Sequence, residues 1–162
     1  MEKILKKVQE RQGLLLAMKI ISHCAVGVSG VGYALLLVLA FRVSLWYALE
    51  TVLFTFIPFV IVSAVRKLIN APRPYELYDF YTMPTKSKKG ASFPSRHAYS
   101  AFVIGCALLY VCAPFGIVVF AFAVLMSACR VLLGIHFVRD VLCGALAGVL
   151  SALLGNLIFT HV

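Results

Sequence analysis

The chain has 162 residues, of which 62% are apolar and only 13% are charged. A soluble domain has about 45–50% apolar and about 25% charged residues, and the mean hydropathy here is +0.99. This composition excludes a disordered chain, which lacks apolar surface to bury, and it argues against a water-soluble monomer. The length suits one domain, and the composition indicates a membrane protein.

The charge balance is strongly basic, with 15 Lys and Arg residues against 6 Asp and Glu residues and a net charge of +9. In so apolar a chain, cations belong at the ends of membrane spans or around anions. The candidate partners are therefore lipid phosphates or another anionic substrate. Nucleic acid is disfavoured, because the chain has no long basic helix or aromatic–basic platform.

The predicted elements begin with residues 1–19, which carry five cations among apolar residues at helical spacing. This pattern predicts an amphipathic helix that lies on the membrane. Five apolar segments follow, each near the length of about 20 residues that a bilayer-spanning helix needs. They cover residues 20–41, 46–65, 97–113, 115–133 and 137–159. The predicted fold is an all-α, polytopic transmembrane helical bundle that forms a single domain over residues 1–162.

These spans place most of the positive charge on one side of the membrane. Five crossings put the N-terminus, the polar stretch 66–96 and the turn at 130–139 on the same face, which holds 14 of the 15 Lys and Arg residues. Arg42 alone lies on the other face. By the positive-inside rule, the basic face is cytoplasmic. A basic active site would produce the same asymmetry, and both explanations stay open.

Three polar clusters fall on this basic face, at the ends of spans that are far apart in sequence. They are residues 66–74, residues 93–97 and the pattern Arg130-x5-His136-x3-Asp140. Taken singly, each has an ordinary structural explanation, such as an interfacial ion pair, a span-end anchor or a helix start. Their joint occurrence on one face favours a functional site, because a helical bundle would bring them together.

The clusters hold the residue types that phosphate chemistry needs. His136 and Asp140 are four residues apart, so on a helix the carboxylate can accept the imidazole N–H and leave the other ring nitrogen free to attack. His97 begins a span behind Pro94 and Ser95, where free backbone N–H groups and the helix dipole favour an anion. Planar guanidinium groups suited to phosphate oxygens are supplied by Arg66, Arg73, Arg96 and Arg130. Two histidines with several arginines indicate phosphoryl transfer.

The three motifs resemble those of the type 2 phosphatidic acid phosphatase (PAP2) superfamily, also called lipid phosphate phosphatases. The family signature is K-x6-R-P, then P-S-G-H, then S-R-x5-H-x3-D. Here Arg66 stands seven residues before Arg73 in the place of the lysine, and Lys67 is one residue out of register. Arg96 replaces the glycine of the second motif, and Cys129 replaces the serine of the third. The resemblance covers residues 66–140.

The resemblance implies a role for each matched residue. His136 would be the nucleophile that forms a phosphohistidine, Asp140 would orient it, and His97 would protonate the leaving oxygen. The phosphoryl oxygens would be bound by Arg66, Arg73, Ser95 and Arg130, with no metal ion and no cofactor. Arg96 puts a cation where glycine lets the backbone approach a phosphate closely, and it is expected to contact the substrate. This departure bears on substrate choice.

We therefore expect a multi-pass phosphatase of the cell membrane that acts on a lipid phosphate or a polyprenyl diphosphate. The extra cation of Arg96 favours a site that can also bind a diphosphate. One alternative is a non-catalytic transporter or lipid-binding protein that keeps the anion site, although no inverted repeat supports a transporter. Another is a vanadate-dependent peroxidase, although those relatives are typically soluble. The resemblance suggests an extracytoplasmic or lumenal site for many members. The ten cations of the basic face that are not predicted phosphate ligands favour the cytoplasm.

The sequence leaves the oligomeric state open. In the last predicted span, Gly144 and Gly148 form a G-x3-G pattern, which permits two helices to approach closely. The close partner is either a neighbouring helix of the same bundle or a second copy of the chain.

Overall fold

A computed structural model describes residues 2–78 and 89–159 of the chain. The secondary structure in these two ranges is entirely helical. In chain order the helices are α1 (Glu2–Gln9), α2 (Gln12–Val43), α3 (Leu45–Ile69), α4 (Pro74–Leu77), α5 (Arg96–Val111), α6 (Ala113–Leu132) and α7 (Val138–Phe159). The predicted all-α bundle is confirmed.

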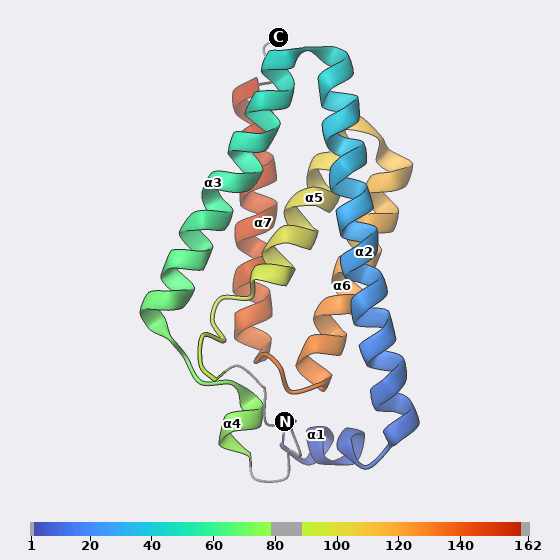
Figure 1. The fold of residues 1–162 in the computed structure, drawn as a ribbon, viewed down its shortest axis with the longest axis vertical. Coiled ribbons are helices and arrows are strands. Elements are labelled where there is room, and N and C mark those ends of the chain that lie inside the picture. The colour runs from blue at the N-terminus through green and yellow to red at the C-terminus, as the bar shows by residue number, and fades with distance from the viewer. Residues whose placement is uncertain (1, 79–88, 160–162) are drawn as a thin grey trace.

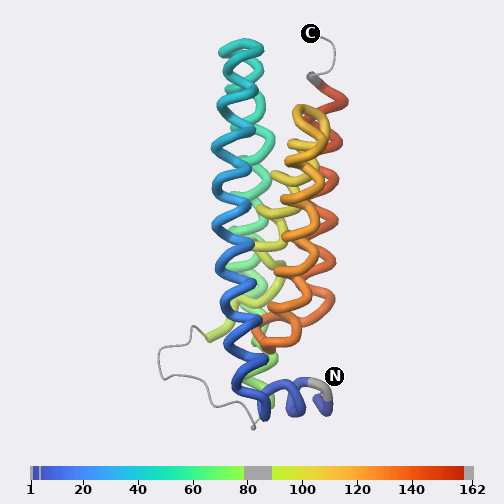
Figure 2. Tube along the Cα trace, turned by 90° about the vertical axis from the view of Figure 1, so that its right-hand side faces the viewer, coloured from blue at the N-terminus to red at the C-terminus, as the bar shows by residue number. Residues whose placement is uncertain are grey.

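The five longer helices run side by side along one elongated bundle (Figures 1 and 2). Helices α1 and α4 lie at one end of it, together with the turn that joins α6 to α7. The α2–α3 connection lies at the opposite end. We call the end that holds α1, α4 and the α6–α7 turn the basic end. The three polar clusters of the sequence all belong to this end of the molecule.

Helix α5 occupies the centre of the bundle. Helices α2, α3, α6 and α7 are long and apolar enough to cross a membrane, whereas α5 has only 16 residues. At 1.5 Å per residue it extends about 24 Å, less than the roughly 30 Å of a bilayer's hydrocarbon core. It packs against all four of the longer helices, and most of its residues are buried. Because protein surrounds α5, the thickness of the lipid does not set its length.

The N-terminal helix is shorter than the sequence predicted. Helix α1 ends at Gln9, and Gln12 begins α2, so the second half of the segment 1–19 belongs to the first long helix. Helix α1 contacts α2 and α6, and its Leu5 and Val8 side chains are buried. The apolar side of this amphipathic helix therefore lies against the basic end of the bundle.

Two glycines let α7 approach α5 closely. A Cβ atom added at Gly144 would lie 2.4 Å from the carbonyl oxygen of Ser95, and one added at Gly148 would lie 2.6 Å from that of Tyr99. Real Cβ atoms do not come so near a backbone oxygen, so only glycine fits at either position. The G-x3-G pattern thus serves packing within the bundle.

Candidate active site

The centre of the site is His136, in the short turn between α6 and α7. Its side chain is only 1% exposed. The backbone N–H groups of His136 and Ile135 both donate to the carbonyl oxygen of Arg130, at 3.3 and 3.0 Å. These bonds close the turn at the end of α6 and hold the imidazole against the start of α7.

A serine hydroxyl links His136 to Asp140. The Oγ atom of Ser92 donates to Asp140 Oδ2 at 2.5 Å and lies 3.3 Å from His136 Nδ1. The direct distance from His136 Nδ1 to Asp140 Oδ2 is 3.6 Å, too long for a strong hydrogen bond. Since the Ser92 hydroxyl uses its proton on the carboxylate, it accepts the proton of Nδ1. The other ring nitrogen, Nε2, then keeps a free lone pair.

Asp140 is itself held rigidly in the first turn of α7. Its Oδ2 atom also accepts the backbone N–H of Phe137 at 2.9 Å, and its carbonyl oxygen accepts the N–H of Ser95 at 2.9 Å. The side chain is fully buried. Its Oδ1 atom has no hydrogen bond, but Arg139 Nε lies 3.6 Å away. Ser92, Phe137 and Arg139 thus hold the carboxylate, and Ser95 holds the backbone of the same residue.

The segment that carries Ser92 is pinned to the end of α3 and to α4. The Asn70 side chain accepts the N–H of Ala91 at 3.0 Å, and Glu76 Oε1 accepts the N–H of Gly90 at 2.7 Å and that of Arg73 at 3.1 Å. Gly90 has φ +67°, a conformation that favours glycine. These bonds tie the first polar cluster of the sequence to the second.

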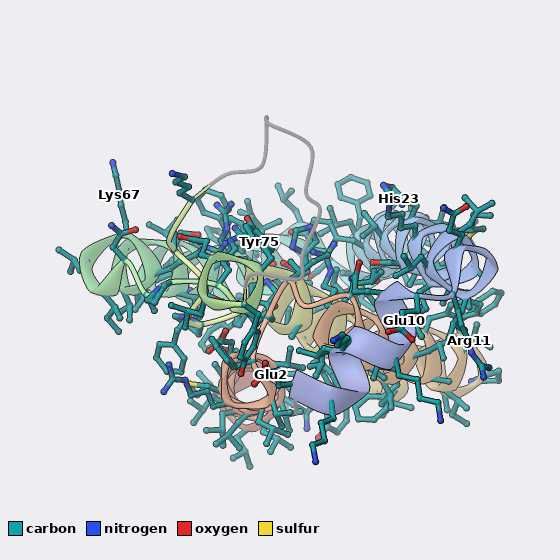
Figure 3. All side chains as sticks on the ribbon, turned by 90° about the horizontal axis from the view of Figure 1, so that it is seen from below. Glu2, Glu10, Arg11, His23, Lys67 and Tyr75 are labelled. Carbon is teal, nitrogen blue, oxygen red and sulfur yellow. The ribbon has the colours of Figure 1, made fainter. Side chains whose placement is uncertain are left out.

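The structure distinguishes Arg66 from its neighbour Lys67. Arg66 is 8% exposed, and its Nη1 atom donates to the carbonyl oxygen of Pro94 at 3.1 Å. Lys67 is exposed on the outer side of α3 and points away from the bundle (Figure 3). Of the two, Arg66, which has the motif's spacing to Arg73, is the one that points into the bundle.

Two more guanidinium groups complete the basic environment of His136. Arg73 Nε donates to the carbonyl oxygen of Gly90 at 3.0 Å. Arg130 has a buried Nε atom with no hydrogen-bond partner. An unpaired buried donor is costly, and a phosphate oxygen would satisfy it. The charges of Arg66, Arg73 and Arg130 all act on His136.

Burial lowers the pKa of His136 below its ordinary value, because the charged imidazolium loses hydration. The interaction with Asp140 opposes this effect, and the three arginine charges add to it. The net direction is downward, so the imidazole is neutral at neutral pH. A neutral imidazole with a free nitrogen is the form that can attack an electrophile.

The start of α5 borders the site and opens into a pocket. Ser95 caps this helix: its Oγ atom accepts the N–H of Ala98 at 3.4 Å, and its side chain is fully buried. His97 is exposed, close enough to His136 and Arg130 for their charges to act on it. Arg96 and His97 both line a pocket of about 400 Å³ between α2, α3, α5 and α6. Its other walls are largely apolar.

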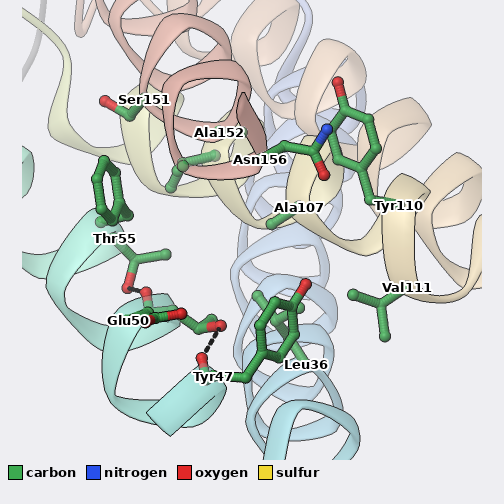
Figure 4. Close-up of a pocket in the computed structure, with 14 residues that line it drawn as sticks. Leu36, Tyr47, Glu50, Thr55, Ala107, Tyr110, Val111, Ser151, Ala152 and Asn156 are labelled. Atoms are coloured by element: carbon green, nitrogen blue, oxygen red, sulfur yellow. Dashed lines mark hydrogen bonds between the residues drawn. The ribbon is translucent and has the colours of Figure 1, made fainter. Parts of the chain in front are cut away.

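A smaller pocket, of about 60 Å³, lies near the opposite end of the bundle (Figure 4). Polar side chains from α3, α5 and α7 line it, among them Glu50, Tyr110 and Asn156. None of the predicted site residues belongs to it. The described residues hold no cluster of three His, Cys, Asp or Glu side chains that could bind a metal ion.

The sequence did not single out Ser92, Asn70 or Glu76. Ser92 stands two residues before Pro94 and carries no signal of its own. Asn70 and Glu76 are ordinary polar residues, each two positions from a proline. Their functions depend on the fold of the segment between α3 and α5, which no local pattern describes.

The helices and their apolar length define a multi-pass membrane protein of the all-α class. Its fold is similar to two solved structures. The crystal structure of Aquifex aeolicus LpxE is 22% identical with a TM-score of 0.70, and the match covers 94% of this chain and 92% of that one. The first transmembrane PAP2 type phosphatidylglycerolphosphate phosphatase from Bacillus subtilis is 24% identical with a TM-score of 0.61, covering 97% and 91%. No curated protein matches.

The sequence model of the PAP2 superfamily matches residues 44–161, which include α3, α5, α6, α7 and all three polar clusters. The chain belongs to the PAP2 superfamily. It is an enzyme of the PAP2 phosphatase type, as the motifs predicted.

Proposed function

We propose that this protein hydrolyses a lipid phosphate or an isoprenoid diphosphate through a phosphohistidine formed on His136. The observation that carries the proposal is the state of His136, which is buried, held at Nδ1 by the Ser92–Asp140 pair and surrounded by three guanidinium groups. A fixed and neutral imidazole in a strongly positive pocket suits in-line attack on an anionic phosphorus centre.

In the first step, Nε2 of His136 attacks the phosphorus atom and the bond from phosphorus to the leaving oxygen breaks. The negative charge of the bound phosphate offsets the arginine charges that act on His97. His97 is thereby protonated in the substrate complex and gives its proton to that oxygen. Arg66, Arg73 and Arg130 neutralise the charge on the three phosphoryl oxygens, which is the main contribution that a protein makes to phosphoryl transfer. The backbone N–H groups at the start of α5, behind Ser95, add further donors.

In the second step, water attacks the phosphohistidine and the phosphorus–nitrogen bond breaks. His97, now neutral, accepts the proton of the water, and inorganic phosphate leaves. Both steps use side chains of this chain alone, so the proposed reaction needs no metal ion or cofactor. The departure of Cys129 from the family serine leaves these groups in place.

The lipid part of the substrate is proposed to occupy the pocket of about 400 Å³ beside His97. Its polar rim and apolar walls, which include Phe59, Ile104 and Met126, suit a molecule with a charged head and a hydrocarbon tail. The Bacillus subtilis neighbour is named for a phosphatidylglycerolphosphate substrate, which supports a lipid phosphate here. We also propose that the site faces the cytoplasm, because the basic end carries nearly all of the lysines and arginines.

The experiment is phosphate release by the detergent-purified protein from lipid monophosphates and diphosphates, with EDTA present. We expect release in the wild type and a fall in kcat of about 10⁴-fold or more in His136→Ala, the scale seen when a nucleophile is removed. His23→Ala is the control, since His23 is an exposed residue of α2 that bonds only to the backbone of its own helix. Vanadate is expected to inhibit, as an analogue of the transferring phosphoryl group.

Retained turnover in a folded His136→Ala protein would refute the nucleophile. An absence of release from every lipid, with the protein folded and no binding of vanadate, would instead support the non-catalytic alternative.

A further inference from the structure

One cation of the site faces the pocket without a hydrogen-bonded partner in the part of the chain that the structure describes. Arg96, the first residue of α5, is half-buried and makes neither a hydrogen bond nor an ion pair with any described residue. Its guanidinium carbon lies 5.9 Å from the centre of the Phe59 ring. A cation–π contact compensates only part of the hydration that a guanidinium group loses on burial. The structure therefore presents a positive charge that is ready for an anion.

Arg96 lies on a different side of the site from the other guanidinium groups. It lines the pocket of about 400 Å³ together with His97, whereas Arg66, Arg73, Arg130 and His136 are absent from that lining. Arg66, Arg73 and Arg130 surround the imidazole of His136 instead. Arg66 and Arg130 act on His97 as well as on His136, so what distinguishes Arg96 is its place in the lining of the pocket.

The side that Arg96 occupies is the side of the leaving group. This step rests on the proposed function, in which His97 protonates the leaving oxygen and the lipid fills the pocket. If the leaving group were a neutral alcohol, Arg96 would gain no partner when the substrate binds. If the leaving group carries its own phosphate, the guanidinium group forms a charge-assisted hydrogen bond at the mouth of the pocket.

We propose that Arg96 binds a second phosphate, carried by the leaving group, and selects substrates that have two phosphates. In a lipid diphosphate this is the inner phosphate: attack by His136 breaks the bond from the outer phosphorus to the bridging oxygen. That oxygen takes the proton of His97, and a lipid monophosphate leaves. In phosphatidylglycerol phosphate it is the phosphodiester of the departing phosphatidylglycerol. Both sources offer the same chemistry to Arg96.

The test compares matched substrates in the full-length enzyme in detergent. Farnesyl phosphate and farnesyl diphosphate differ by one adjacent phosphate, and phosphatidate and phosphatidylglycerol phosphate differ by a phosphodiester farther away. The variants are Arg96→Gln, Arg96→Lys and Arg96→Gly, the last restoring the family residue. Arg42→Gln, at the opposite end of the bundle, is the control. A melting temperature in detergent shows whether each variant is folded.

We expect Arg96→Gln to lower the ratio of kcat/KM for the two-phosphate substrate to that for its one-phosphate partner by about 10- to 100-fold, the effect of one hydrogen bond between charged groups. Arg96→Lys is expected to lower this ratio less, because lysine keeps the positive charge but lacks the planar guanidinium group that can form two parallel hydrogen bonds. The substrate pair whose ratio falls shows whether the second phosphate is the adjacent phosphate of a diphosphate or the phosphodiester of phosphatidylglycerol phosphate.

The proposal is overturned if folded Arg96→Gln and Arg96→Lys have the same two ratios as the wild type. This includes the case in which kcat/KM falls equally for the two substrates of each pair. Either result, with an active wild type, leaves the proposed phosphatase intact. A wild type inactive on all four lipids overturns both.

Discussion

At His136, a hydroxyl group from another part of the chain decides which ring nitrogen is free for the proposed attack. Ser92 lies between Nδ1 of His136 and the Asp140 carboxylate, and it accepts from the first while it donates to the second. The carboxylate therefore acts on the imidazole largely through the serine. Ser92 is a positioning residue, since it holds the ring so that Nε2 carries the free lone pair.

We predict that Ser92→Ala lowers kcat by about 10-fold while KM changes little, because the loss of one hydrogen bond of about 1.4 kcal/mol misplaces the nucleophile without touching the phosphate ligands. Steady-state kinetics with one lipid phosphate checks this. Ser151→Ala is the matched control, a buried serine in the distal half of α7. A Ser92→Ala enzyme with a raised KM and an unchanged kcat would contradict the assignment.

Among the elements, the contact between α5 and α7 is the one on which the site depends. It brings Ser95, the cap of α5, beside Asp140 in the first turn of α7, where the Ser95 N–H donates to the Asp140 carbonyl oxygen. The approach is possible because Gly144 and Gly148 leave room for the backbone of α5. A side chain at either position would separate the helices.

We predict that Gly148→Ala destabilises the protein by about 1–3 kcal/mol, the usual cost of inserting a methyl group into a tightly packed interface. A Cβ atom there would lie 2.6 Å from the carbonyl oxygen of Tyr99 and 2.9 Å from the nitrogen of Val103. Unfolding in detergent measures the change. Gly27→Ala is the control, because no atom lies within 4 Å of its added Cβ. Equal stabilities for the two variants would show that α7 does not need the glycine.

For the whole molecule, the distribution of charge is the basis of the proposed orientation in the membrane. All eight lysines of the chain belong to the basic end in the predicted topology. Six of them lie in the described ranges, while Lys86 and Lys88 lie outside the described residues. The four arginines around the proposed phosphate site account for only part of the asymmetry. On the proposed cytoplasmic orientation, the remaining cations keep the basic end on the cytoplasmic side.

We predict that a membrane-impermeant amine reagent leaves the wild-type protein unlabelled in intact cells. Leu45→Lys, which adds an exposed lysine at the start of α3 on the opposite end, should be labelled under the same conditions. Permeabilised cells provide the control, since lysines at the basic end then become accessible. Labelling of the wild type from outside would place the site on the extracytoplasmic face.

The sequence by itself determined the class of the fold and the enzyme family. Apolar length is a local property, so the four long membrane helices were predicted with small errors at their ends. The largest error was at the start of α2, which was predicted at residue 20 and lies at Gln12. The cations of residues 11–19 have the pattern of a separate helix on the membrane surface. The motif spacings named Arg66 over Lys67, and the side chains lie as that spacing requires.

Only the tertiary structure decided how the motifs meet. The partner of His136 Nδ1 is Ser92, which is 44 residues away, and no periodic pattern connects the two. The position of Arg96 beside His97 in the lining of a pocket depends on how α2, α3, α5 and α6 surround that pocket. Both contacts arise from packing between segments that are far apart in the sequence. A local sequence pattern predicts helices and motifs, but it does not predict which distant side chains meet.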